Sequence, residues 1–245
     1  MEIIPAIDIK EGKCVRLLKG NFNQETEYHK NPVVIAQKFE GMGFRNLHLV
    51  DLDGAKSGGQ TNQSIVETIA TELGFVMQLG GGLRNSADIS AWLSAGIKRC
   101  VVGSIAVKKP KRMKNWLTRY GADSLVLALD IRFRKGIPML ATDGWLEDSD
   151  ISLWDAVEDY LDSGLRHVLC TDIDRDGAMA GPNIDLYTEF IERYPEIALQ
   201  ASGGVRNIQD LYSLRKIGSA AAITGRALLD GCITNKEITS FLRAE

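Results

Sequence analysis

The chain has 245 residues, of which 44% are hydrophobic and 25% are charged, and its formal net charge is −3. The length permits one large domain, and this composition excludes disordered and fibrous chains. The small negative charge excludes a strongly basic nucleic-acid-binding protein. No apolar run reaches the roughly 20 residues that cross a bilayer, and the first residues lack a signal-peptide pattern. We therefore expect a soluble cytoplasmic protein that binds neither nucleic acid nor membrane.

Cysteine and histidine residues show no ligand spacing. They are scattered along the chain as Cys14, Cys100, Cys170 and Cys232, and as His29, His48 and His167. A zinc site or a disulfide framework requires such side chains at short, regular spacings. We therefore expect neither, and we expect His48 and His167 to pack within apolar strands.

Short apolar segments alternate with amphipathic ones along the whole chain. Strands are predicted at residues 3–8, 46–52, 76–80, 99–102, 125–130, 167–172, 198–202 and 220–224. Most are aliphatic without polar alternation, which is typical of parallel strands covered on both faces. Ile208, Leu211 and Leu214 show the apolar helical face of the segments between them. With no GxGxxG fingerprint after the first strand, the pattern predicts a single (β/α)8 TIM barrel, residues 1–245, rather than an open doubly wound sheet.

Several motifs recur at a constant distance. The segment AIDIK at residues 6–10 matches ALDIR at 128–132, and GGLRN at 81–85 matches GGVRN at 203–207, both at an offset of 122. This offset is half the chain length. We therefore predict two repeated (β/α)4 half-barrels, about residues 1–122 and 123–245, which close on each other and share one site.

Glycine-containing pairs follow four of the predicted strands. They are Gly81 and Gly82, Gly103 and Ser104, Gly203 and Gly204, and Gly225 and Arg226. Bare backbone before a helix N-terminus binds phosphate, and an arginine adds a charged donor. In a barrel these loops meet at the C-terminal ends of the strands. The pairs predict a small-molecule substrate with a phosphate at each end; tight βα turns are the alternative interpretation.

Three aspartates are candidates for acid–base chemistry. Asp8 ends the first predicted strand and Asp130 the fifth, which places them across the barrel mouth between the phosphate loops. Asp176 lies in the loop after the sixth strand, and the corresponding loop of the first half is two residues shorter. A protonated carboxyl and an opposed carboxylate divide acid and base roles when their pKa values differ. We expect one to open a sugar ring while the other removes a carbon-bound proton.

Four further residues are candidates for substrate contacts. Thr171 is placed to orient a sugar hydroxyl, and Arg16 and Arg84 are placed to bind anionic or carbonyl groups. Trp145 lies in a polar loop after the fifth strand, where an exposed, mobile indole would stack on a planar heterocycle. Three of them have a structural alternative: strand propensity for Thr171, solvation for Arg16 and hairpin packing for Trp145.

Nine segments carry a family resemblance. They are IIPAIDIKEGKCVRLLKG, LHLVDLDGAKSG, QLGGGLRN, VVGSIAV, LALDIR, DGW, CTDIDRDGAMAGPN, ASGGVRN and ITGRALLDG. Together they resemble the ProFAR isomerase family (phosphoribosylformimino-5-aminoimidazole carboxamide ribotide isomerase) of histidine biosynthesis, over essentially the whole chain. The resemblance implies an Amadori rearrangement of an aminoaldose to an aminoketose, with no cofactor, in a substrate that has two phosphoribosyl ends.

The resemblance also implies roles for particular residues. Asp8 is the base that removes the proton next to a Schiff base. The acid is either Asp130 or Asp176 of the RDG motif, and we prefer Asp176 because the longer loop singles it out. The matching substrate-contacting positions are Arg16, Arg84, Trp145 and Thr171, and Gly177 of the RDG motif is placed with them as a binding residue.

Three rival functions stay open at this point. The related cyclase subunit usually has a cysteine beside the strand-one aspartate, where this chain reads Pro5-Ala6-Ile7-Asp8. A bifunctional isomerase would also act on phosphoribosylanthranilate, and a non-catalytic barrel would only bind a phosphometabolite. We expect a monomer whose loops after the first and fifth strands are mobile without ligand.

Overall fold

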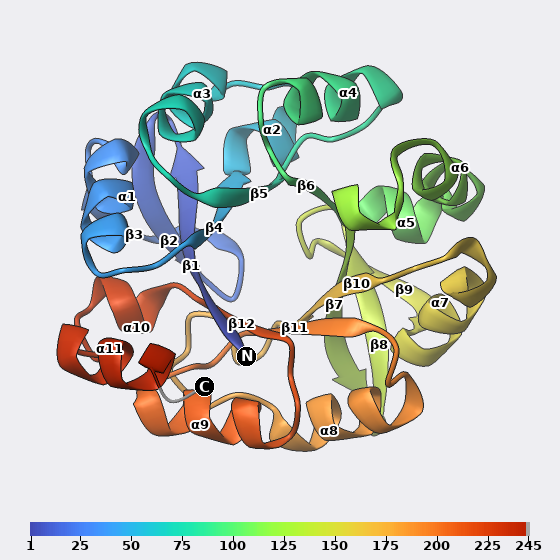
Figure 1. Ribbon diagram of the computed structural model, residues 1–245. Coiled ribbons are helices and arrows are strands. Elements are labelled where there is room, and N and C mark those ends of the chain that lie inside the picture. The colour runs from blue at the N-terminus through green and yellow to red at the C-terminus, as the bar shows by residue number, and fades with distance from the viewer. Residues whose placement is uncertain (244–245) are drawn as a thin grey trace.

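Eight parallel strands close into a barrel in the computed structural model, which describes residues 1–243 (Figure 1). In chain order they are β1 (Glu2–Lys10), β4 (Asn46–Asp51), β5 (Val76–Gly80), β6 (Arg99–Val102), β7 (Leu125–Arg134), β10 (His167–Asp172), β11 (Ala198–Ser202) and β12 (Ala221–Thr224). Each pairs in parallel with the next, and β12 pairs with β1. The predicted TIM barrel is thereby confirmed, while its origin from two repeated halves stays a prediction.

Two hairpins are additions that the apolar pattern did not predict. They are formed by β2 (Lys13–Leu18) with β3 (Asn21–His29), and by β8 (Ile137–Thr142) with β9 (Glu147–Ser152). Both continue a barrel strand into antiparallel pairing, β2 with the end of β1 and β8 with the end of β7. The predicted strands end at residues 8 and 130, whereas β1 continues to Lys10 and β7 to Arg134. Strands β3 and β9 were missed because they are mostly exposed and polar, so no apolar run marks them.

The helices surround the barrel (Figure 1). They are α1 (Pro32–Gly41), α2 (Leu52–Ser57), α3 (Gln63–Glu72), α4 (Ser86–Ser94), α5 (Ser104–Lys108), α6 (Pro110–Tyr120), α7 (Leu153–Tyr160), α8 (Ile184–Arg193), α9 (Ile208–Lys216), α10 (Arg226–Leu229) and α11 (Asn235–Arg243), with 3-10 turns at Ala122–Ser124 and Leu161–Ser163. The asparagine of each GGxRN motif caps a helix, since Asn85 and Asn207 accept backbone N–H bonds at the starts of α4 and α9. Equivalent motifs therefore set equivalent helix starts.

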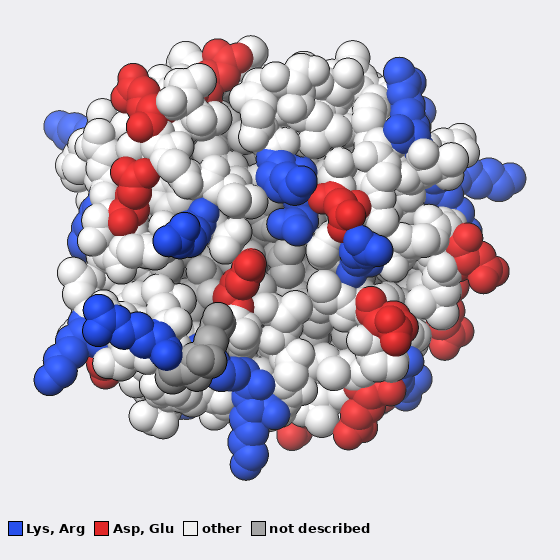
Figure 2. Space-filling view, viewed as in Figure 1, with Lys and Arg blue, Asp and Glu red and all other residues white. Residues whose placement is uncertain are grey.

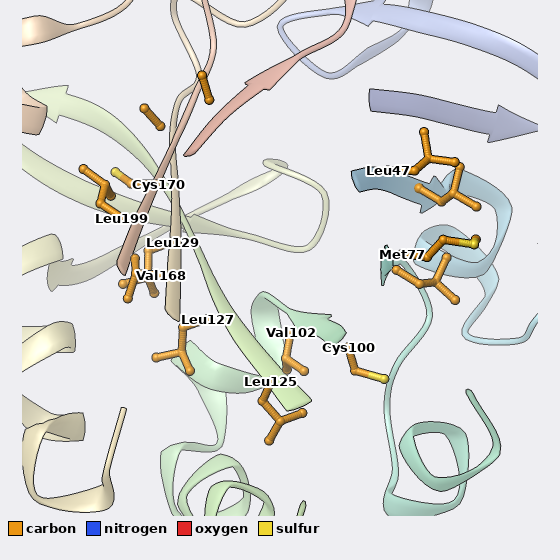
Figure 3. Packing of buried hydrophobic residues seen from close by; sticks show 14 of the residues in the cluster. Leu47, Met77, Cys100, Val102, Leu125, Leu127, Leu129, Val168, Cys170 and Leu199 are labelled. Atoms are coloured by element: carbon orange, nitrogen blue, oxygen red, sulfur yellow. The ribbon is translucent and has the colours of Figure 1, made fainter. Parts of the chain in front are cut away.

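The hydrophobic core has two layers. Outward-facing strand residues such as Leu47, Met77 and Val168 lie between the strands and the surrounding helices (Figure 3). A smaller cluster fills the barrel interior and consists of Ile4, Ala6, Val101, Val126, Leu169, Ala221 and Ile223, with Ala128 packed against it. These side chains fill the interior, so the barrel is a packed core rather than a pore.

A buried polar pair crosses the barrel interior beside this cluster. Gln78 on β5 donates to Gln200 on β11 over 2.7 Å, and Gln200 donates back over 3.1 Å. Gln78 also donates to Nδ1 of His48, 3.1 Å away. Both glutamine side-chain amides therefore have hydrogen-bond partners, which reduces the free-energy penalty of burying them.

The molecular surface carries both signs of charge. On the face shown in Figure 2, Lys and Arg side chains alternate with Asp and Glu, in keeping with the net charge of −3. Across residues 1–243, no helix is both long enough and apolar enough to span a bilayer.

Candidate functional site

A cavity of about 710 Å³ opens among the loops that follow the parallel strands. Its lining contains every site residue predicted from the sequence: Asp8, Arg16, Gly81, Gly82, Arg84, Gly103, Ser104, Asp130, Trp145, Thr171, Asp176, Gly177, Gly203, Gly204, Gly225 and Arg226. These residues come from both halves of the chain, so the loops of one barrel face build a single site.

The glycine loops on opposite sides of the cavity have nearly the same backbone conformation. Gly81 and Gly203 both have a φ of +99°, and Gly82 and Gly204 are also in the left-handed region. A Cβ atom on Gly81 would lie 2.1 Å from the Asp51 carbonyl oxygen, whereas one on Gly203 would lie 2.8 Å from that of Asp172. These tight turns require glycine whether or not a ligand binds there. The same four glycines line the cavity.

The loops after β6 and β12 match in the same way. Gly103 precedes α5 with φ −99° and ψ −96°, and Gly225 precedes α10 with φ −102° and ψ −85°. Arg226 donates to the Gly177 carbonyl oxygen over 2.7 Å, and Arg84 donates to the carbonyl oxygens of Ala55 and Lys56 in α2, each over 3.3 Å. Each end of the cavity thus has a glycine loop and an arginine in its lining, and their binding of phosphate stays a prediction.

Arg16 links two of the candidate carboxylates. It lies on β2, and Asp8 pairs with its neighbour Val15 across the β1–β2 ladder. The guanidinium is 3.0 Å from the Asp8 carboxylate and 3.1 Å from that of Asp176. Its side chain is only 12% exposed, so Arg16 is not a solvated strand residue. Its Nε is buried and has no hydrogen-bond partner within the described residues.

The electrostatics of Asp8 suit a base. Burial raises its pKa to about 6, Arg16 opposes this shift, and the charge of Asp176 adds to it. At neutral pH such a carboxylate is mostly ionised, yet it binds a proton more strongly than an exposed aspartate does.

Asp130 lies at the equivalent strand end in a different environment. Burial raises the pKa of this carboxyl, hydrogen bonds from Trp145 and Thr171 oppose the shift, and Asp176 adds to it. Thr171 is buried on β10 opposite Asp130 in the ladder register. The three aspartates therefore form one electrostatic group, with Asp176 acting on both strand-end carboxyls.

Trp145 differs from its prediction. It was expected to be exposed, but it is half-buried: its ring lies against Gly20, where a Cβ atom would be 2.3 Å from the ring, and the indole lowers the pKa of the Asp130 carboxyl. The reason is the conformation of the turn between β8 and β9. Asp143, Gly144 and Trp145 all have positive φ angles there, and all three residues line the cavity. The expectation of an exposed indole is therefore wrong for this state of the protein.

Some lining residues were missed by the sequence analysis. Lys56, Lys108 and Ser202 line the cavity, as does His48, which was expected only to pack in a strand. Burial lowers the pKa of His48 to about 3, and the nearby Arg16 contributes in the same direction, so this ring is neutral. The period-two alternation of β4, which places His48 and Val50 on one face, was the available signal. Among the described residues, no group of three potential metal ligands converges.

The loops after β4 and β10 are anchored alike. Asn62 donates to the Asp51 carboxylate over 2.6 Å, and Asn183 donates to that of Asp172 over 2.7 Å. Only the loop after β10 brings a carboxylate, that of Asp176, into the cavity. The two loops are thus anchored by the same Asn–Asp hydrogen bond, but only one of them adds an acidic group to the site.

The sequence as a whole can now be compared with known families. Residues 2–234 match the model of the histidine biosynthesis protein family, which spans the complete barrel and both sides of the cavity. The chain therefore belongs to this family of barrel enzymes of histidine biosynthesis.

Proposed function

We propose that the protein is the aldose–ketose isomerase of this family, which converts the ProFAR aminoaldose to its aminoketose, PRFAR, by acid–base catalysis without a cofactor. The observation that carries the proposal is the arrangement of one cavity: three aspartates and Arg16 lie between two glycine loop pairs with matching torsions. In the strand order, β5 and β6 lie across the barrel from β11 and β12. A substrate with a phosphate at each end would span the carboxylates.

The glycine loops are proposed to bind the two phosphates. Gly81, Gly82, Gly103 and Ser104 would hold one, with Arg84 nearby, and Gly203, Gly204, Gly225 and Arg226 would hold the other. Arg16 also lies against the second site, because a Cβ atom on Gly225 would be 2.9 Å from its Cζ. Its unpartnered Nε supports a ligand contact, since a buried donor without an acceptor is costly.

The reaction is proposed to begin with ring opening. The acid donates a proton to the ring oxygen, the C–O bond breaks, and the nitrogen lone pair forms a Schiff base. Asp8 then takes the proton from the adjacent carbon, and the electron pair forms an enolamine that tautomerises to the ketone. An Asp8 pKa of about 6 supports this role, because the carboxylate is available at neutral pH and is a better base than an exposed aspartate.

Asp176 is our proposed acid, and Asp130 is the alternative. Asp176 is bound to Arg16, so an acid role requires substrate to draw Arg16 away. Asp130 has the raised pKa that favours holding a proton. The Asp176→Asn and Asp130→Asn variants distinguish them: loss of the acid should remove the alkaline limb of the pH–rate profile, and only the correct variant should do so.

The direct test is a spectroscopic isomerisation assay with purified substrate and no added metal or nucleotide. Turnover is the expected result, and no turnover by folded protein would reject the proposal. Supplying PRFAR and ammonia tests for the cyclase reaction, and supplying phosphoribosylanthranilate tests for bifunctionality. A barrel that only binds phosphometabolites would show ligand-induced thermal stabilisation without turnover of any of these compounds.

A further inference from the structure

The turn between β8 and β9 is held in an unfavourable conformation. Asp143 has φ +54°, Gly144 +65° and Trp145 +70°, and two of these three residues have side chains. Non-glycine residues adopt the left-handed region only at a cost in free energy, and they persist there when surrounding contacts hold them. The turn therefore needs partners outside itself to keep the Trp145 ring against Gly20.

Lys108 supplies contacts at both ends of this turn. Its ammonium group is bound to the Asp143 carboxylate before Trp145, and it lies 2.7 Å from the Glu147 carboxylate after it. Ser104 on the same helix accepts the Asp143 backbone N–H over 2.9 Å. Helix α5 thus fixes the turn on each side of the indole.

We propose that Lys108 is a positioning residue that holds the Trp145 ring against Gly20 in the cavity wall and couples this position to the glycine loop at the start of α5. The expected effect of Lys108 on turnover rests on the proposed function. Its effect on the position of Trp145 does not, because that position is a property of the free protein. An exposed ion pair alone contributes little, but here one ammonium group joins both ends of a strained turn.

The first test measures Trp145 directly. Acrylamide quenching is recorded for the wild type and for Lys108→Met, each with its own Trp145→Phe background subtracted, because the chain has four tryptophans. We expect quenching of Trp145 to increase by about twofold or more in Lys108→Met and to return towards wild type in Lys108→Arg. Unchanged quenching would overturn the proposal, whatever the enzymatic activity.

A matched control is available on the next helix. Lys114 on α6 forms a comparable ion pair with Asp159, 2.7 Å long, and does not line the cavity. The Lys114→Met variant should leave both Trp145 quenching and turnover unchanged. An equal effect of Lys114→Met would show general loosening and would contradict a specific role for Lys108.

Kinetics then separate positioning from direct phosphate binding. We expect Lys108→Met and the double variant Asp143→Asn/Glu147→Gln each to lower kcat by about tenfold with a smaller change in KM. Combining all three substitutions should add little, because they break the same contacts. If Lys108→Met raises KM alone while the double variant behaves as wild type, Lys108 is a phosphate ligand and the positioning proposal is wrong.

If the isomerisation assay fails for the wild type, the kinetic experiments cannot be interpreted, but the quenching experiment can. Increased quenching of Trp145 in Lys108→Met would still support the role of Lys108 in holding the β8–β9 turn. The failure of the proposed function and the failure of this inference are therefore distinguishable.

Discussion

The hairpin after β1 and the hairpin after β7 follow matching sequence motifs but deliver different groups to the cavity. The first brings Arg16, a cation that contacts Asp8 and Asp176. The second brings Trp145, a neutral indole that lines the same cavity and lowers the pKa of Asp130. The two aspartates occupy equivalent positions in the repeated motif, yet one contacts a charged group and the other is influenced by an uncharged ring. The hairpins between barrel strands, rather than the strands themselves, make the two carboxyls chemically different.

The largest expected effect is a difference between the two strand-end aspartates. Asp8→Asn should lower kcat by about 10³–10⁴-fold, because it removes the proposed base. Asp130→Asn should cost at least tenfold less if the comparison between the hairpins is right. Steady-state kinetics measure both. Thermal stabilisation by inorganic phosphate should be retained in each variant, and equal losses of kcat would mean that the two carboxyls share one role.

The glycine loops provide the next comparison. Gly81→Ala and Gly203→Ala face the same torsion of +99°, but the new Cβ would be 2.1 Å from backbone at residue 81 and 2.8 Å at residue 203. Both should destabilise the fold by about 2–4 kcal/mol, and Gly81→Ala should cost more. Urea unfolding checks this order. Gly96→Ala, with φ +95° and open space around the Cβ, isolates the cost of the torsion.

The smallest expected effect concerns pH. With Asp8 as base, kcat/KM should fall as the pH drops below about 6, since protonation removes the carboxylate. Arg16 lowers the pKa of Asp8, so Arg16→Gln should move this acid limb to higher pH. Lys13→Gln, on the same strand but paired with Glu27, should not move it. A wild-type acid limb near pH 4, typical of an exposed aspartate, would refute this assignment.

The sequence predicted the barrel because its strands are aliphatic runs, and it predicted the cavity lining because parallel strands in a barrel end on one face. It did not predict either hairpin: β3 and β9 are polar and exposed, and β2 and β8 pair antiparallel with the ends of β1 and β7 rather than joining the parallel barrel. The Arg16–Asp176 contact joins residues 160 positions apart. Such a contact depends on how far a hairpin reaches, and local patterns carry no information on that. The burial of Trp145 has the same cause.

The pairing of β1 with β12 has a consequence for synthesis of the chain. One edge of the first strand, at Glu2–Pro5, finds its partner only at Ala221–Thr224. At a translation rate of about 5–20 residues per second, that edge waits roughly ten to forty seconds. During this interval the nascent protein presents an unpaired strand, the kind of surface that chaperones cover. Asp8 is therefore among the first parts of the site to be made, yet it joins the finished enclosure only when the last strand has left the ribosome.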